Sequence, residues 1–389
     1  MKNISLKHKL KIFIDETLGK LLINLPQFGK YTNAVFLIRT DNIGDYILFR
    51  NFLPYIRHSK KYRNRKLVLI GNTIWRDLAE HYDSAFIDAS MWLDVGKYKK
   101  SLWYKYGFLF KIWWQNPLEI VNIAHSHIKI TDDLTIASKA KFRTTCLGDD
   151  INLIPPAETL EKSMGYYNKI INSLPNTTFE FFRNKAFIEN WLDEAVDIAR
   201  MSFEGIEKKE NNQQIIGFFI GAHSIYRQWD INNFVDLIEA IHTHFPSFYI
   251  EIYGGKGDYT EGVRLENSVS KTVKISNFCG KTTVSELVVK IAHCRLLISN
   301  ESSAVHIAAA VDTPTVCVAN GERFGRFSPY PVQMSTCINT IFPHESFYFE
   351  ENYKDYTHKF QYKSTMDINT ITPEVVLPTI FSILKNDNN

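Results

Sequence analysis

The stretch from Arg295 to Asn320, RLLISNESSAVHIAAAVDTPTVCVAN, alternates short apolar runs with a polar turn and an alanine-rich segment. The runs Leu296–Ser299 and Thr315–Ala319 are continuous and apolar, which is typical of strands covered on both faces in a parallel sheet. Between them, the turn Asn300–Ser303 leads into a predicted helix over Ala304–Val311. The stretch therefore predicts a strand–helix–strand unit of an α/β fold.

The same unit is suited to hold an anion. A helix that starts at the carboxyl end of a strand presents unpaired backbone N–H groups and the positive end of its dipole there. Glu301, Ser302, Ser303 and His306 would lie around that position. On this stretch alone, an ordinary strand–helix–strand unit with a serine N-cap is the favoured interpretation. Only the rest of the chain can separate the two interpretations.

The composition excludes several classes of protein. With 389 residues, 45% of them hydrophobic and 22% charged, the chain is globular in composition and long enough for two or three domains. A net charge of +3 gives no support for a nucleic-acid partner. The five cysteines lack CxxC spacing and several lie in apolar runs, so we expect reduced thiols, a cytoplasmic location and no zinc site.

The N-terminal segment MKNISLKHKLKIFIDETLGKLLINL leaves two interpretations open. Apolar residues at helical spacing, with lysines near one end, fit a basic amphipathic helix that rests on an anionic membrane. A helix packed on the domain, with its lysines in water, fits equally well. Asp15 and Glu16 interrupt the apolar part and no small-residue cleavage site follows, so we expect no signal peptide. No apolar run approaches the ~18–20 residues of a membrane span.

Strand and helix signals alternate along two parts of the chain. The first part begins with a strand at Ala34–Ile38, a turn at Asp41–Gly44 and a helix from Asp45 towards Arg57. Such alternation predicts mostly parallel sheets. Further strands are predicted at residues 67–71, 85–88, 119–124, 142–148, 215–222, 248–255 and 273–280, and helices at 185–201, 232–244, 261–270, 284–293 and 373–384.

Two other segments have distinctive compositions. Lys97–Gln115, KYKKSLWYKYGFLFKIWWQ, is dense in aromatic and cationic residues. It suits a bilayer interface or a sugar-lined groove, and a large core helix with solvated lysines explains it equally well. The polar run Glu204–Gln214 marks a domain boundary.

Three polar turns follow predicted strands, at Thr40–Tyr46, Gly221–Trp229 and Asn300–His306. In open α/β sheets, ligands bind beyond the carboxyl ends of the strands. Two such domains facing each other would enclose a cleft between these turns.

The ordered motifs resemble those of glycosyltransferase family 9, the ADP-heptose:lipopolysaccharide heptosyltransferases. The resemblance rests on five motifs that occur in the same order along the chain. The first two are a basic residue before a turn that closes in Gly-Asp, and a Gly-Ala turn before a basic-x-Trp triplet. The other three are a Gly-Lys-Thr segment before Glu-Leu, a polar triplet before His-x-Ala-Ala-Ala, and a Pro-Tyr pair. These are Arg39 with Gly44-Asp45, Gly221-Ala222 with Arg227-Gln228-Trp229, Gly280-Lys281-Thr282 with Glu286-Leu287, Glu301-Ser302-Ser303 with His306 to Ala310, and Pro329-Tyr330. They run from about Ala34 to Tyr330.

The resemblance implies a GT-B-like α/β fold, in which two Rossmann-type domains with mostly parallel sheets face a central cleft. We divide the chain into an N-terminal amphipathic helix or extension (1–30), an acceptor-side domain (31–185), a helix and linker (186–214), a nucleotide-sugar-binding domain (215–362) and a C-terminal helical segment (363–389). The last segment could pack back on the N-terminal domain.

The resemblance also implies roles for individual residues. Asp45 takes the position of the catalytic carboxylate that accepts the proton of the attacking hydroxyl, although a carboxylate there could merely cap its helix. Arg227 takes the position of the basic residue that binds the diphosphate in the family. The remaining donor-side residues are Gly221, Ala222, His223, Ser224, Asp258, Glu301, Ser302, Ser303 and His306, and the acceptor-side or secondary residues are Arg39, Asn42, Gly44, His125, Arg323 and Arg326.

We therefore expect an inverting, metal-independent glycosyltransferase. It would move heptose or a related sugar from a nucleotide-sugar, with an ADP-sugar favoured, to a lipopolysaccharide or other surface-glycan acceptor. We expect no other cofactor, and a cytoplasmic protein that binds peripherally to the anionic inner membrane. His125 and His127, with Asp132 and Asp133, could suggest a metal site, but an acceptor-facing or structural role is favoured.

One departure separates this chain from the family pattern. The family has Asp-Thr-Gly where this sequence has Glu301-Ser302-Ser303, so the pocket for the donor sugar is expected to differ. Two alternatives stay open: a nucleotide-sugar epimerase or hydrolase of the same fold, and a non-catalytic protein that binds sugar nucleotides.

Overall fold

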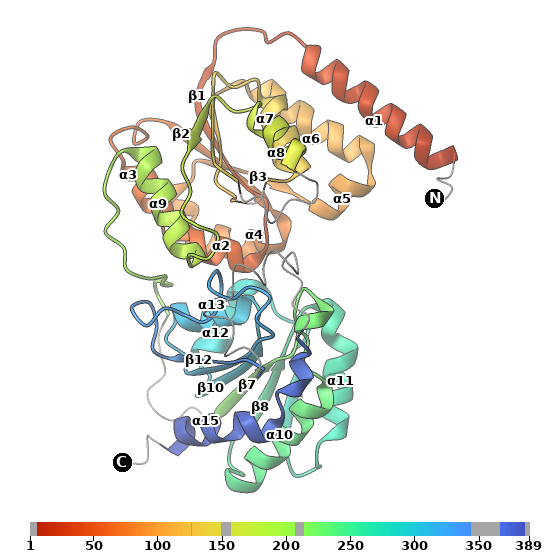
Figure 1. The fold of residues 1–389 in the computed structure, drawn as a ribbon, viewed down its shortest axis with the longest axis vertical. Helices are drawn as coiled ribbons and strands as arrows, with labels where there is room; N and C mark the ends of the chain where they lie inside the picture. Colours follow the sequence, from red (N-terminus) through yellow and green to blue (C-terminus); the bar gives the residue numbers. More distant parts are fainter. Residues whose placement is uncertain (1–5, 126, 149–156, 207–213, 344–365, 386–389) are drawn as a thin grey trace.

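The structure, a computed structural model, describes residues 6–125, 127–148, 157–206, 214–343 and 366–385, and stacks two α/β domains along its long axis (Figure 1). The N-terminal domain is built on a six-stranded sheet in the order β3-β2-β1-β4-β5-β6, in which every pair is parallel. Its strands are β1 (Thr32–Arg39), β2 (Lys66–Asn72), β3 (Ala89–Leu93), β4 (Pro117–Asn122), β5 (Phe142–Cys146) and β6 (Lys169–Ile171).

Apolar residues of β1 alternate between two cores, because successive side chains of a strand point to opposite faces. Val35 and Leu37 belong to one core, and Phe36 and Ile38 to the other. The first core is completed by α2 (Ile43–Arg50), α3 (Leu53–His58), α4 (Arg76–Tyr82) and α9 (Glu180–Leu192), and the second by α6 (Leu102–Gln115) and α7 (Lys129–Ser138). The domain also holds α5 (Val95–Lys100), α8 (Ala157–Met164) and α1 (Leu6–Asn24), which lies against α6 and α7.

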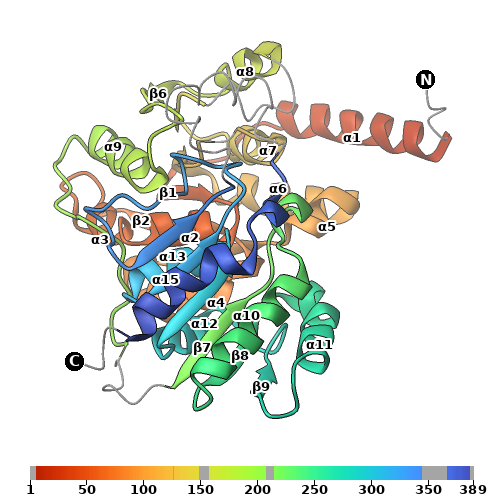
Figure 2. The same cartoon turned by 60° about the horizontal axis from the view of Figure 1, so that its bottom comes forward.

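The C-terminal domain repeats this plan. Its sheet has the order β12-β11-β10-β7-β8-β9, again with parallel pairs. Starting from β9, this is the same topology as that of the first sheet. The strands are β7 (Ile215–Phe219), β8 (Tyr249–Tyr253), β9 (Lys274–Asn277), β10 (Leu296–Asn300), β11 (Thr315–Val318) and β12 (Ile338–Ile341). Figure 2 shows α10 (Ile231–His244) and α15 (Pro373–Lys385) in front of this sheet, with α11 (Tyr259–Ser268) beside them.

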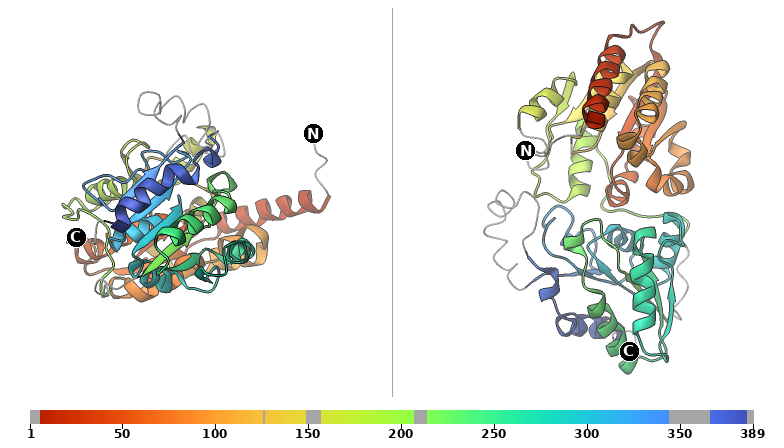
Figure 3. Two further views of the ribbon diagram at one scale, coloured as in Figure 1. Left: turned by 90° about the horizontal axis from the view of Figure 1, so that it is seen from below. Right: turned by 90° about the vertical axis from the view of Figure 1, so that its right-hand side faces the viewer.

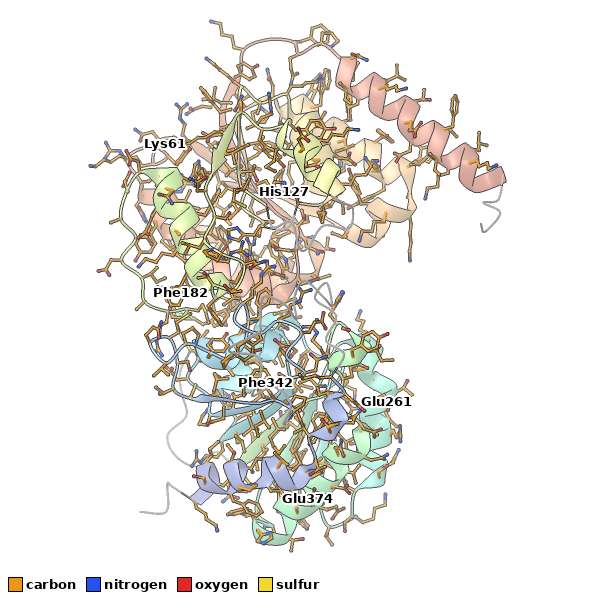
Figure 4. The ribbon with its side chains drawn as sticks, in the orientation of Figure 1. Lys61, His127, Phe182, Glu261, Phe342 and Glu374 are labelled. Carbon is orange, nitrogen blue, oxygen red and sulfur yellow. The ribbon has the colours of Figure 1, made fainter. Side chains whose placement is uncertain are left out.

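The two domains meet through helices on the facing sides of their sheets. The right-hand view of Figure 3 shows the two domains one above the other. Helices α12 (Val284–Ala292) and α13 (Ser303–Ala310) contact α4 and α2 respectively, and one hydrophobic core runs from the N-terminal domain into both helices. Phe182, labelled in Figure 4, packs against this core from α9 at the junction. Polar contacts also join the domains: for example, Ser285 donates its backbone N–H to Asp77 Oδ2 at 2.8 Å, and Arg200 pairs with Asp312.

Four predictions about elements were wrong. The strand expected at 85–88 is the edge strand Ala89–Leu93, and a 3₁₀ turn occupies Ser84–Phe86. The first helix stops at Arg50 and restarts at Leu53 with a proline in its first turn, where proline is tolerated. The helix expected at 185–201 is Glu180–Leu192, ending in left-handed Asp193.

The fourth correction concerns α15. It packs on α10 and β11 of the C-terminal domain, not on the N-terminal domain, because Val376, Ile380 and Leu384 enter the core on that side of the sheet. Residues 207–213 of the predicted boundary and 344–362 of the predicted nucleotide-binding domain lie outside the described ranges.

Candidate active site at the junction of the domains

The first polar turn joins β1 to α2 and is fixed by Arg39. This fully buried guanidinium donates to the backbone oxygens of Asp45 at 2.8 Å and Ile123 at 3.3 Å. Its Nε lies 3.1 Å from Asp41 Oδ2. Asp45 Oδ2 accepts a hydrogen bond of 3.2 Å from the N–H of Asn42, the N-cap of α2. Asp45 is therefore a helix-capping carboxylate, and the cap holds the carboxyl group at the carboxyl edge of the sheet.

Both acidic groups of this turn are harder to ionise than usual. Burial raises the pKa of Asp45, with the Arg39 charge acting against it and Glu180 adding to it. Burial likewise raises the pKa of Asp41 to about 7, again opposed by Arg39. Carboxyl groups that share one site titrate as a pair. A carboxylate whose pKa approaches neutrality is a better proton acceptor than an ordinary one.

Gly44 allows the two domains to approach each other at this turn. A Cβ at this position would lie 2.8 Å from His306 Cδ2 and 3.7 Å from the Cα of Ser303. The start of α2 in one domain therefore meets the start of α13 in the other, and the positive ends of both helix dipoles converge. The structure thus brings together Gly44, Asp45, Ser303 and His306 from the predicted set.

A buried ionic cluster extends from this turn. Glu180, at the start of α9, accepts a hydrogen bond of 2.8 Å from Arg326 Nε, and its backbone N–H donates to the Arg326 oxygen at 2.9 Å. Arg183 lies 3.4 Å from the same carboxylate. Burial would raise the pKa of Glu180, but the charges of Arg326 and Arg183 outweigh it and hold the pKa well below its usual range. Arg326 is therefore a link between the domains.

His125 lies in the same cluster. It follows β4, is buried, and neither ring nitrogen has a hydrogen-bond partner among the described residues. Burial lowers its pKa well below the usual value, although Glu180 acts in the opposite direction. His125 is thus a neutral imidazole with unused hydrogen-bonding capacity, while His127 is already bonded to Ser163 and to the Cys146 oxygen. Within the described ranges no group of three or more His, Cys, Asp or Glu could hold a metal ion.

On the donor side, the Gly221 turn packs directly on Asp258. A Cβ at Gly221 would lie 2.3 Å from Asp258 Oδ2, so any larger residue at this position would displace the Asp258 carboxylate. Asp258 also accepts a hydrogen bond of 2.7 Å from the Gly255 N–H, which places both residues beyond β7 and β8. Along the same turn Ala222 and Ser224 are half-buried and His223 is exposed. Trp229, by contrast, is buried in the core and donates to the Ile371 oxygen at 2.8 Å.

Beside this turn, arginines and glutamates alternate. Arg227 Nε lies 3.5 Å from Glu322 Oε2, and Arg323 lies 3.8 Å from Glu322 Oε1. Glu301 is buried: its Oε1 accepts a hydrogen bond of 2.7 Å from Ser328, and its Oε2 has no partner among the described residues. Burial raises the pKa of Glu301, against the attraction of Arg227. The guanidinium groups are thus preorganised by carboxylates that an incoming anion could replace.

The start of α13 completes the donor side. Ser302 is its N-cap, with a side-chain oxygen 3.3 Å from the N–H of Ala304. His306 is bonded through Nδ1 to the Tyr330 hydroxyl. Burial, together with the charge of Arg227, lowers the pKa of His306 to about 3. The imidazole is therefore neutral, and the capping serine predicted from the sequence is confirmed.

Sequence reasoning missed Asp41, Glu180, Glu322 and Ser328. Asp41 could have been found, since it lies four residues before Asp45 in the same turn. The other three carry no local signal, because each acquires its role from a partner distant in the sequence or from the folded loop between Asn320 and Tyr330.

Two Rossmann-type domains with a polar site at their junction define the GT-B class of nucleotide-sugar-binding folds. A known structure titled as a glycosyltransferase family 9 protein from Veillonella parvula superimposes with a TM-score of 0.68 at 15% identity, covering 91% of this chain and 97% of that one. The E. coli ADP-heptose lps heptosyltransferase II superimposes with a TM-score of 0.62 at 14% identity, covering 92% and 100%. At these identities the likeness shows the fold.

The sequence comparisons agree with this fold. Residues 188–356 match the family model for glycosyltransferase family 9 (heptosyltransferase). A lipooligosaccharide heptosyltransferase 2 of Haemophilus influenzae is 28% identical over 130 residues, which is 33% of this chain and 37% of the relative. Over this part the chain is similar to the heptosyltransferases of glycosyltransferase family 9. The aligned part spans well under two thirds of that relative.

Proposed function

We propose that this protein is an inverting, metal-independent glycosyltransferase that transfers heptose or a related sugar from an ADP-sugar to a lipopolysaccharide or similar surface-glycan acceptor. One observation carries the proposal. The start of α2, with Asp45, meets the start of α13 across the domain junction, beside the arginines of the donor side. The names of the relatives, which are heptosyltransferases, support the choice of sugar.

In the proposed reaction, Asp45 is the general base. The acceptor hydroxyl oxygen attacks the anomeric carbon from the face opposite the diphosphate, and its proton passes to the Asp45 carboxylate. The bond between the anomeric carbon and the diphosphate oxygen breaks, and its electron pair leaves with ADP. The raised pKa of Asp45 supports this role, since proton transfer is most efficient when the base has a pKa near the working pH.

The leaving diphosphate needs positive charge, and we assign that task to Arg227 and Arg323. Guanidinium groups pair with phosphate through two parallel hydrogen bonds. Both side chains are partly buried, with 14% and 26% of their surface exposed, which strengthens their electrostatic effect. The backbone N–H groups at the starts of α13 and of the Gly221 turn would add to this cradle. On this proposal the arginines take the place that a divalent cation has in other glycosyltransferases.

Asp258, beside Gly221, is the proposed partner of the ribose hydroxyls, and Glu301 the proposed contact to the sugar. The free oxygen of Glu301 supports its assignment, because a buried carboxylate oxygen without a partner is costly and a sugar hydroxyl would satisfy it. His125, with its unused ring nitrogens, is the proposed contact on the acceptor side. We place the protein in the cytoplasm, where it would meet a membrane-anchored acceptor.

The proposal is tested by donor binding and product analysis. Thermal unfolding should shift with one class among ADP-, GDP-, UDP- and CDP-sugars, because a ligand at a hundred times its Kd stabilises by about 2.7 kcal/mol. Rapid donor turnover should then require the acceptor, and the product should carry the inverted anomeric configuration. Turnover without acceptor would indicate a hydrolase or epimerase. The absence of a shift with every nucleotide-sugar would contradict the proposal.

A further inference from the structure

The outward face of α6 carries a stripe of aromatic residues. Trp103, Phe110 and Trp114 have 93%, 47% and 72% of their surface exposed. Their spacing of seven and four residues places them on one side of the helix. The opposite side, with Phe108, is buried in the core. The stripe is therefore not required for packing within the described part of the chain.

Helix α1 adds to this face in an unusual way, because it is attached to the domain mainly through polar groups. Lys105, which is buried, donates to Asp15 Oδ1 at 2.7 Å, and Lys11 donates to the backbone oxygen of Lys100 at 3.0 Å. Leu22 is buried in the core of the domain, but other apolar residues of α1 are left exposed, with Leu10 at 57%, Phe13 at 66% and Leu21 at 61%. Figure 3 (left) shows that α1 extends beyond the body of the molecule.

Lysines are mixed with these apolar residues. Exposed lysines on the described parts of α1, α5 and α6 are Lys9, Lys20, Lys97, Lys99, Lys100 and Lys111. The Asp15 carboxylate is neutralised by its bond to Lys105, and Glu16 is the other acidic residue of α1. The face is thus both apolar and positively charged.

A groove of about 750 Å³ opens beside the stripe, between α6 and β3. It is lined by Met91, Trp92, Phe108, Phe110, Lys111 and Trp114, among others. Trp92, which lines the groove, packs against Trp75, with 5.5 Å between the ring centroids. The indole N–H of Trp75 donates to the Asp41 backbone oxygen at 3.1 Å. One tryptophan therefore separates the groove from the candidate catalytic turn.

We propose that α1, the aromatic stripe of α6 and the groove beside it form a surface that docks on an anionic membrane. Tryptophan side chains favour the boundary between headgroups and acyl chains, and lysines near an anionic surface add attraction. A second copy of this chain is a poorer occupant, because it would bring lysines against lysines. The inference rests on the proposed function only in taking the acceptor to be anchored in that membrane.

Vesicle binding by the full chain tests the proposal. We expect co-sedimentation with vesicles of phosphatidylcholine mixed with phosphatidylglycerol, and much less with phosphatidylcholine alone. The double variant W103A/W114A should bind the mixed vesicles about tenfold more weakly or worse, and so should a variant with Lys99, Lys100 and Lys111 changed to Gln. The matched control V332A/V375A, which also removes two exposed apolar side chains, should bind like the unaltered protein.

Three further readouts separate the outcomes. Thermal unfolding and the shift produced by an ADP-sugar should be unchanged in W103A/W114A, which shows that folding and donor binding are intact. Equal binding to neutral and anionic vesicles, or no binding to either, would overturn the proposal. So would a dimer in solution that W103A/W114A dissociates. If transfer activity is absent but the vesicle results hold, the proposed function fails and the docking surface stands.

Discussion

Two carboxyl groups, Asp41 and Asp45, share one turn with a single buried arginine, Arg39. Their raised pKa values follow from this imbalance, since burial disfavours the charged forms and one guanidinium compensates only in part. Glu180 increases the effect on both from across the cluster. At the scale of residues, the site is thus a turn in which burial raises the pKa of both acidic groups and a single arginine opposes it.

Removing the Glu180 charge should shift the pH dependence of kcat/KM. In the unaltered protein, activity should fall as the pH drops through the raised pKa of Asp45, because the protonated carboxyl cannot accept a proton. The substitution Glu180→Gln removes one charge that raises this pKa and frees the Arg326 charge that lowers it. The acidic limb of kcat/KM should therefore shift to lower pH. The exposed Glu261→Gln on α11 should leave the limb in place, and a shift to higher pH in E180Q would contradict the account.

Adding one methyl group at Gly44 should separate the two helix starts. The Cβ of Gly44→Ala would lie 2.8 Å from His306, so we expect at least about a tenfold loss of kcat and ~1–3 kcal/mol of destabilisation. The control Gly107→Ala meets no atom within 4 Å and should stabilise its helix slightly. The double variant G44A/H306A, measured by thermal unfolding, should recover part of the stability. Equal stability of G44A and the unaltered protein would show that the approach is loose.

At the scale of elements, the short helices α2 and α13 matter more than their lengths of 8 residues suggest. Each begins at the carboxyl edge of its sheet, and each is capped by a polar residue of its own turn. Helix α15 instead belongs wholly to the C-terminal core. Its role is to cover the face of the sheet opposite the domain junction.

The position of α15 predicts which substitutions will unfold the C-terminal domain. Ile380 is fully buried against α10 and the sheet, so Ile380→Ala should cost about 2–5 kcal/mol of unfolding free energy. Val375 on the same helix is 54% exposed, and Val375→Ala should cost less than about 0.5 kcal/mol. Denaturant titration of both variants provides the comparison. Similar small losses would mean that α15 is only loosely attached.

Local patterns predicted what depends on local chemistry. The strand–helix–strand unit around Asn300 and the parallel two-domain fold were correct, because apolar runs, turns and caps are properties of neighbouring residues. The strand at 85–88 was misplaced because β3 is a half-exposed edge strand with little apolar pattern. The ion pair of Glu180 with Arg326 spans 146 positions, so no local signal could have revealed it.

At the scale of the whole molecule, the two domains are joined by both apolar and ionic contacts. One hydrophobic core crosses the junction, and the Glu180–Arg326 pair lies within it with 2% and 4% of the side chains exposed. Removing one member of a buried pair is far more damaging than losing an exposed pair, because the remaining charge stays buried without compensation.

Substitution of Arg326 by Ala should therefore cost about 3–5 kcal/mol at neutral pH. Because the folded-state pKa of Glu180 is lowered, the pair stabilises the fold above the unfolded-state pKa of ~4.3 and loses this effect as the pH falls further. The difference between R326A and the unaltered protein should shrink in acid. The exposed pair of Arg264 with Glu261 is the control, and Arg264→Ala should cost less than ~1 kcal/mol at any pH. Equal losses in both variants would show that the junction does not depend on this pair.

The central claim is that Asp45 is the base of a glycosyl transfer at this junction. The most direct measurement is the single-turnover rate of Asp45→Asn with ADP-heptose and a lipopolysaccharide acceptor, beside the stabilisation of the variant by the donor. We predict a rate about 10²–10⁴-fold lower with donor binding retained. The variant Asp94→Asn, which changes a helix-capping carboxylate of α5 to the amide in the same way, should transfer normally. Transfer by D45N at a rate close to that of the unaltered protein would contradict the account.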